Sequence, residues 1–124
     1  SEARAAQKSS GEALGAMVAA KMEAYASRVL GSPHAAELME VSNRIGGATI
    51  AARAAAAEAA LARAIAAERS AGRLTLKRGI TPAELASLLT AAANGAKYGA
   101  VQPPDVLGAR VKRIVALMVD GARA

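Results

Sequence analysis

Apolar residues recur at helical spacing along this chain, and glycine or proline separates one run from the next. The first run predicts a helix that starts near Ser9 or Ser10 and ends near Leu30, just before Gly31. Residues 1–11 are mostly small or polar, so we expect them to be disordered or frayed. The apolar stripe of the helix has spacings of four, four, three and four residues and consists of Leu14, Val18, Met22, Tyr25 and Val29.

Two further helices are predicted in the middle of the chain. Ser32-Pro33 supplies an N-cap and a first helical residue, which indicates a short helix. Gly46-Gly47 indicates a kink or a junction, because a glycine inside a helix costs about 1 kcal/mol. Beyond it, the longest helix is expected to reach about Ala71 and to end at Gly72, with a loop over residues 73–80.

The last two helices have the clearest sequence signals. Thr81-Pro82-Ala83-Glu84 combines an N-cap threonine, a proline at the first helical position and a glutamate that can reach back to the cap. Pro103-Pro104 breaks the chain before the final helix. We expect that final helix to bury one apolar stripe, made of Leu107, Val111, Ile114, Val115 and Met118.

Composition supports an all-helical fold. Alanine, the best helix former, makes up more than a quarter of the 124 residues, while Phe and Trp are absent and only two Tyr occur. The fold class predicted is therefore all-α, a compact bundle of about five helices in a single domain over residues 12–124. Because each alanine buries little apolar area, we also expect an oligomer interface to add to the core.

The charge and the absent residue types narrow the functional classes. The formal net charge is +6, but the basic residues are dispersed and lack aromatic neighbours, so this chain is not expected to bind nucleic acid specifically. The chain has no cysteine and no secretory signal, and no apolar run approaches the ~18 residues of a membrane span. We therefore expect a cytoplasmic protein.

No group of residues predicts catalysis or metal binding. His34 is the single histidine, and only Glu37 and Glu40 stand near it, which is too few ligands for a usual metal site. The sequence contains no phosphate-binding glycine motif and no nucleophile elbow. We expect no enzyme activity and no cofactor.

Uncommon side chains on alanine-rich helices are candidates for a small-molecule pocket. Methionine and tyrosine suit an adaptable apolar cleft, and asparagine can orient a ligand. We expect the pocket between the helix of residues 12–30, the helix after Gly46-Gly47 and the helix opened by Thr81. The candidate ligand-binding residues are Met17, Met22, Tyr25, Met39, Asn43, Asn94 and Tyr98.

The order of these elements and several short segments resemble a known family. The segments are A-E-R-S-A-G-R-L (67–74), T-P-A-E-L (81–85), A-N-G-A-K (93–97), L-M-V-D-G-A-R-A (117–124) and S-P-H-A-A-E-L (32–38). Over about residues 12–124 the chain resembles the C-terminal effector-binding and dimerisation domain of bacterial tetracycline-repressor (TetR) family transcriptional regulators.

The resemblance implies a ligand sensor that works as a homodimer. In such regulators an effector, often apolar, shifts the dimer geometry and thereby the DNA affinity of an N-terminal helix-turn-helix. That DNA-binding part is missing from this chain, and we expect the coding sequence upstream of Ser1 to encode it. The last two helices would form the dimer interface, for which the candidates are Leu88, Ala92, Gly95, Gly99, Leu107, Val111, Ile114, Val115 and Met118.

One alternative belongs to a different class. A structural or coat protein, such as a phasin-like granule-associated protein, would also be alanine-rich, helical and oligomeric. Such a protein is expected to have longer uninterrupted amphipathic helices and fewer proline and glycine breaks than this chain has. A start codon directly before Ser1 would favour this alternative.

Overall fold

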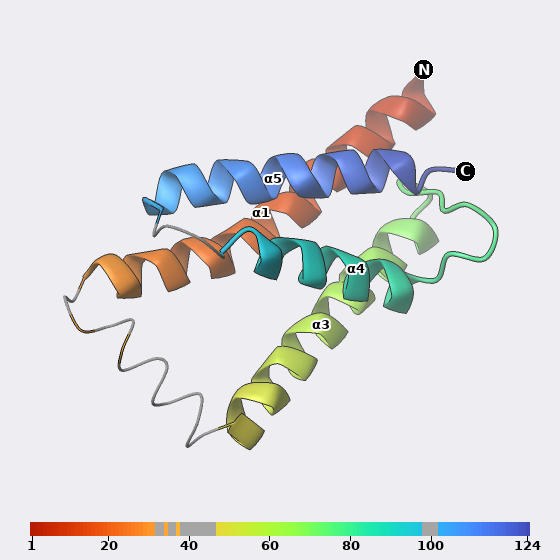
Figure 1. Cartoon of the computed structure of the whole chain (residues 1–124). Helices are drawn as coiled ribbons and strands as arrows, with labels where there is room; N and C mark the ends of the chain where they lie inside the picture. Colours follow the sequence, from red (N-terminus) through yellow and green to blue (C-terminus); the bar gives the residue numbers. More distant parts are fainter. Residues whose placement is uncertain (32–33, 35–36, 38–46, 98–101) are drawn as a thin grey trace.

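The computed structural model describes residues 1–31, 34, 37, 47–97 and 102–124. Within them the chain is helical, without strands, as predicted (Figure 1). The four helices are α1 (Glu2–Leu30), α3 (Gly47–Ser70), α4 (Pro82–Gly95) and α5 (Pro104–Gly121). The short helix expected after Ser32-Pro33 lies outside the described residues, so the expected total of about five is not reproduced by these four. None of the helices in the described ranges combines the length and the apolar character that a membrane span requires.

The start of α1 differs from the expectation. Residues 1–11 were expected to be frayed, yet α1 begins at Glu2, and the Ser1 hydroxyl accepts a hydrogen bond from the Arg4 backbone N–H. Gln7 and Ser10, whose polarity suggested an exposed segment and a helix cap, are 3% and 2% exposed. Their side chains are hydrogen-bonded to distant parts of the chain, which compensates for their burial.

The boundaries of α3 and α4 agree with the sequence signals. Gly72 follows α3 with a φ of +78°, a left-handed conformation that glycine adopts without steric cost. The Thr81 hydroxyl accepts a hydrogen bond from the Glu84 N–H at 3.1 Å, which confirms the predicted N-cap. The reciprocal bond from the Thr81 N–H to the Glu84 carboxylate is not formed.

The largest interface between helices joins α1 and α5, which lie side by side (Figure 1). Both helices contribute long apolar residues to it, and α3 packs mainly on α4. The connection between α3 and α4 is part of the core as well, because Leu74 is buried and the Lys77 N–H donates to the Ala122 carbonyl at 2.8 Å. The largest buried apolar residues are Leu14, Val18, Leu61, Ile65, Leu74, Leu85, Leu89, Leu107, Val111, Val115 and Val119.

Two glycines allow α1 to approach α5 closely. A Cβ atom added to Gly15 would lie 3.5 Å from the Cα of Lys112, and one added to Gly11 would lie 3.5 Å from a methyl group of Val119. These distances are ordinary van der Waals contacts for one methyl group, but they leave no space for a longer side chain. The packing of α1 on α5 therefore sets an upper limit on side-chain size at both positions.

We predict opposite effects for two substitutions at Gly15. Gly15→Ala should raise the free energy of unfolding by about 0.5–1 kcal/mol, because alanine has the higher helix propensity and its methyl group fits. Gly15→Leu should lower it by about 1–3 kcal/mol, because the larger side chain meets the backbone of α5. Urea denaturation followed by circular dichroism measures both changes. Equal effects of the two substitutions would contradict the close packing.

Candidate functional site

A cavity of about 180 Å³ lies between α1, α3 and α4. These are the three helices between which the sequence analysis places a ligand pocket. Side chains from all three helices line the cavity, and most of them are apolar. They are Met17, Val18, Lys21 and Met22 from α1, Ala54, Ala57 and Leu61 from α3, and Thr90, Ala93 and Asn94 from α4.

The cavity exists because α3 presents small side chains to it. Leu61 and Ile65 anchor the C-terminal half of α3 in the core, where both are buried. Further toward the N-terminus, the positions that line the cavity are Ala54 and Ala57, whose methyl groups cannot fill the distance to α1. Space between helices that a leucine would occupy thus stays open and apolar.

The structure brings together three of the seven predicted ligand-binding residues. Met17, Met22 and Asn94 line the cavity. Tyr25 is not among the lining residues. It packs against the core beside them, while Met39, Asn43 and Tyr98 lie outside the described residues.

Several residues that line the cavity were not predicted from the sequence. Thr90 lies four residues before Asn94, and Lys21 lies four residues after Met17, so helical spacing would place each on the same face as a predicted residue. The alanines gave no signal, because an alanine beside a cavity has the same sequence pattern as an alanine in a tight contact.

Tyr25 does not line the cavity but contacts a lysine that follows α4. The Nζ of Lys97 lies 4.6 Å from the centre of the Tyr25 ring, in a cation–π contact. Partial burial lowers the pKa of Lys97, and the positive charge of Arg28 lowers it further. Lys97 and Arg28 therefore create a positive potential at the C-terminal ends of α1 and α4.

Three polar side chains of the cavity lining have no partner in the described part of the chain. Thr90 and Asn94 on α4 make no side-chain hydrogen bond there, and Lys21 on α1 forms neither an ion pair nor a hydrogen bond. Thr90 and Asn94 are half-buried, whereas Lys21 is exposed. Their hydrogen-bonding capacity is thus available to a molecule in the cavity.

Part of the predicted dimer interface is buried inside the single chain, which is a correction. Leu107, Val111 and Val115 are 2%, 0% and 0% exposed, because they face the core that α5 shares with α1. Ile114, Met118 and Ala92 are half-buried, and Gly99 lies outside the described residues. What remains available on α4 and α5 includes Leu88, which is 50% exposed, Gly95, and Leu117, which is 55% exposed and was not predicted.

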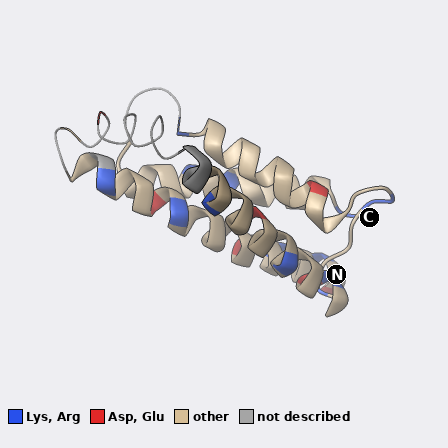
Figure 2. Cartoon of the chain, turned by 90° about the horizontal axis from the view of Figure 1, so that it is seen from below, with Lys and Arg blue, Asp and Glu red and all other residues tan. Residues whose placement is uncertain are grey.

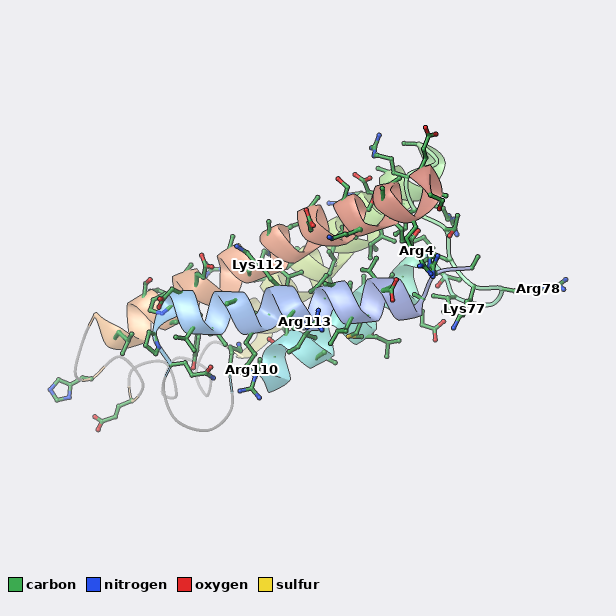
Figure 3. All side chains as sticks on the ribbon, turned by 90° about the horizontal axis from the view of Figure 1, so that it is seen from above. Arg4, Lys77, Arg78, Arg110, Lys112 and Arg113 are labelled. Atoms are coloured by element: carbon green, nitrogen blue, oxygen red, sulfur yellow. The ribbon has the colours of Figure 1, made fainter. Side chains whose placement is uncertain are left out.

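The charged residues are distributed over the whole molecule. Figure 2 shows Lys and Arg on several helices, with Asp and Glu between them. Arg110, Lys112 and Arg113 lie along α5, whereas Arg4 and Lys77 lie at the end of the molecule that holds both termini (Figure 3). Arg73, which belongs to a basic cluster in the sequence, forms an ion pair with Glu68 at 2.6 Å.

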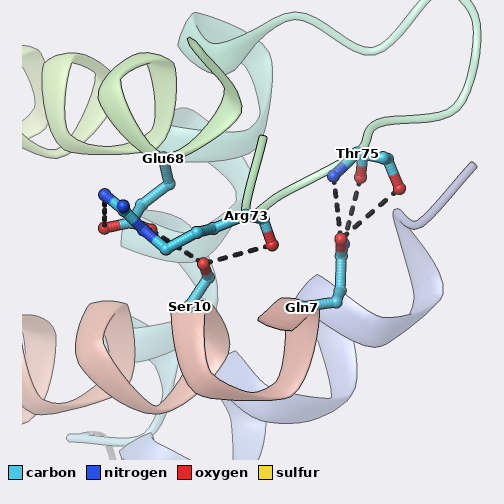
Figure 4. A network of polar contacts seen from close by, with 5 residues as sticks. All are labelled: Gln7, Ser10, Glu68, Arg73 and Thr75. Carbon is cyan, nitrogen blue, oxygen red and sulfur yellow. Dashed lines mark hydrogen bonds and ion pairs between the residues drawn. The ribbon is translucent and has the colours of Figure 1, made fainter. Parts of the chain in front are cut away.

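A polar network ties the start of α1 to the connection between α3 and α4 (Figure 4). The Gln7 amide donates to the Thr75 carbonyl at 3.0 Å and to the Val119 carbonyl at 3.4 Å, and it accepts from the Thr75 N–H at 2.8 Å. The Ser10 hydroxyl donates to the Glu68 carboxylate at 2.9 Å. Hydrogen bonds from Arg73 and then from Ser10 lower the pKa of Glu68 below its ordinary value of 4.5.

These hydrogen bonds and the ion pair have a structural role. The Glu68 carboxylate is already engaged by a guanidinium and a hydroxyl, and no group of three or more potential metal ligands occurs among the described residues. The His34 ring nitrogen lies 3.7 Å from the Glu37 carboxylate, and both side chains are largely exposed. The apolar cavity is therefore the strongest candidate for a functional site.

Comparison with models of protein families, with curated proteins and with solved structures found no match to this chain.

We predict that Gln7 stabilises the fold through its amide group. Gln7→Met keeps the length of the side chain but removes four hydrogen bonds, so it should lower the free energy of unfolding by about 1–3 kcal/mol. Lys8→Met is the matched control, because Lys8 is exposed on the next position of α1 and should change stability by less than about 0.5 kcal/mol. Chemical denaturation of both variants checks the difference, and equal stabilities would contradict the assigned role.

Proposed function

We propose that this chain is the ligand-sensing and dimerisation domain of a transcriptional regulator that resembles the TetR family. A small apolar effector binds in the cavity between α1, α3 and α4. Its binding shifts the geometry of a homodimer and thereby the DNA affinity of the regulator's helix-turn-helix.

The cavity carries this proposal. It lies between the three helices where the residue pattern of the sequence places a pocket, and Met17, Met22 and Asn94 line it. Its walls are mostly apolar with a few polar groups, which is the usual composition of a small-molecule site.

The dimer part of the proposal rests on the apolar residues exposed on α4 and α5. Leu88 on α4 and Leu117 on α5 are each about half exposed, as are Val106 on α5 and Leu30 on α1. Alanine and glycine beside them, such as Ala91 and Gly95, allow a second helix to approach closely. We propose that a second copy of the chain covers this face.

We predict that filling the cavity abolishes effector binding. A thermal-shift screen of small apolar compounds should find stabilising ligands, since a ligand at a hundredfold excess over its Kd adds about 2.7 kcal/mol of stability. Ala57→Phe places a ring in the cavity and should remove the shift. Ala55→Phe is the matched control, because Ala55 is exposed on the same helix and does not line the cavity. A screen without any ligand, or equal shifts in both variants, would count against the sensing function.

We predict that a charge on α4 or α5 weakens the dimer. Leu88→Glu and Leu117→Glu should each raise the dimer dissociation constant by at least about tenfold, because an unpaired carboxylate would be buried at the interface. Leu30→Glu is the control, since Leu30 is exposed to the same degree, 53%, but belongs to α1. Analytical ultracentrifugation measures the three constants. A stable monomer of the unmodified chain at micromolar concentration would falsify the dimer proposal.

A further inference from the structure

The size of the cavity limits the apolar part of its ligand. Its volume of about 180 Å³ is slightly above the ~150 Å³ of an apolar protein cavity that binds benzene. An apolar body of about one six-membered ring therefore fills it. Met17 and Met22 are the most adaptable side chains of the lining, and the exposed Lys21 and Ala54 leave the cavity open to solvent.

The charges at the cavity favour an anionic head group on that ligand. Among the lining residues, Lys21 is the single charged one, and the described part of the chain offers it no carboxylate partner. Thr90 and Asn94 reach the cavity from α4, opposite the helix that carries Lys21, with free hydrogen-bond donors. Lys97 and Arg28 add positive charge near the ends of the same two helices.

The one lysine at this apolar cavity can neutralise one negative charge on a ligand, and a second charge would have no partner. A carboxylate carries one negative charge on two oxygens, which can accept from an ammonium group, a hydroxyl and an amide at once. A cationic ligand would meet Lys21 and the positive potential beside it. A neutral ligand would fill the cavity without an ion pair to Lys21, whose exposed ammonium group would stay hydrated.

We propose that the effector is a small apolar monocarboxylate, of about the size of benzoate, whose ring fills the cavity and whose carboxylate is bound by Lys21 with Thr90 and Asn94. This inference deepens the proposed sensing function and rests on it. It adds the charge and the size of the ligand, which the resemblance to the TetR family does not give.

Isothermal titration calorimetry of the 124-residue chain with benzoate, benzyl alcohol and benzylamine tests the proposal. The three compounds share a ring and differ in the charge of the head group. Benzoate should bind more tightly than benzyl alcohol by about fivefold, the upper range for an exposed ion pair, and benzylamine should bind most weakly. Higher salt should reduce the difference between benzoate and benzyl alcohol.

Variants of Lys21 test whether this side chain causes the preference for benzoate over benzyl alcohol. Lys21→Met should remove the advantage of benzoate over benzyl alcohol, and Lys21→Glu should place benzoate last. Lys8→Met is the matched control, since Lys8 lies on the same helix but does not line this cavity, and it should keep the preference. Asn94→Leu should lower the affinity for both benzoate and benzyl alcohol.

The outcomes separate this inference from the proposed function. The inference is overturned if benzyl alcohol or benzylamine binds as tightly as benzoate, or if Lys21→Met keeps the preference, while sensing of apolar ligands still stands. It is also overturned if none of the three binds but larger apolar compounds bind in a manner sensitive to Ala57→Phe. If no apolar compound binds at all, the sensing function fails together with the inference.

Discussion

The close packing of α1 on α5 is the contact on which the remaining structure depends. Two glycines of α1, Gly11 and Gly15, leave the backbone of α5 within van der Waals distance of one added methyl group. Beside these glycines α5 contributes Val111 and Val115, which are fully buried. Without aromatic residues in its core, the chain gains burial by shortening the distance between helices rather than by enlarging side chains.

The small side chains of this alanine-rich sequence also explain the cavity between α1, α3 and α4. Small side chains make tight contacts only where two helices can approach each other, and α3 packs mainly on α4 rather than on α1. Ala54 and Ala57 therefore face α1 across a distance that their methyl groups do not fill. An alanine-rich chain thus yields a tight interface at α1–α5 and an open one at α1–α3. The open interface costs stability, because its lining loses dispersion contacts, and a ligand that fills it would restore them.

The features that depend on neighbouring residues were predicted correctly from the sequence. The cap at Thr81 and the helix end at Gly72 depend on nearby backbone geometry, and both were predicted. The prediction that Gln7 is an exposed polar residue was wrong. Its hydrogen bonds reach Thr75, which is 68 residues away in the sequence, and no local pattern indicates such a partner. Val111 was also wrongly assigned to a subunit interface, since periodicity identifies the apolar side of a helix but not the surface that covers it. The cavity could be placed between three helices, but its volume depends on distances between helices that no sequence pattern contains.

Helix α1 connects the polar network at one end of the molecule with the cavity. Gln7 and Met22 lie 15 residues apart on one uninterrupted helix, which corresponds to about 22 Å. A helix is stiff over this length, so α1 cannot shift at Met22 without a displacement near Gln7 or a bend between them. The hydrogen bonds of Gln7 to Thr75 and Val119 resist such a displacement, because they fix α1 to the α3–α4 connection and to α5. A displacement of α1 at Met22 that reaches its first turns would therefore have to break or distort the hydrogen bonds of Gln7.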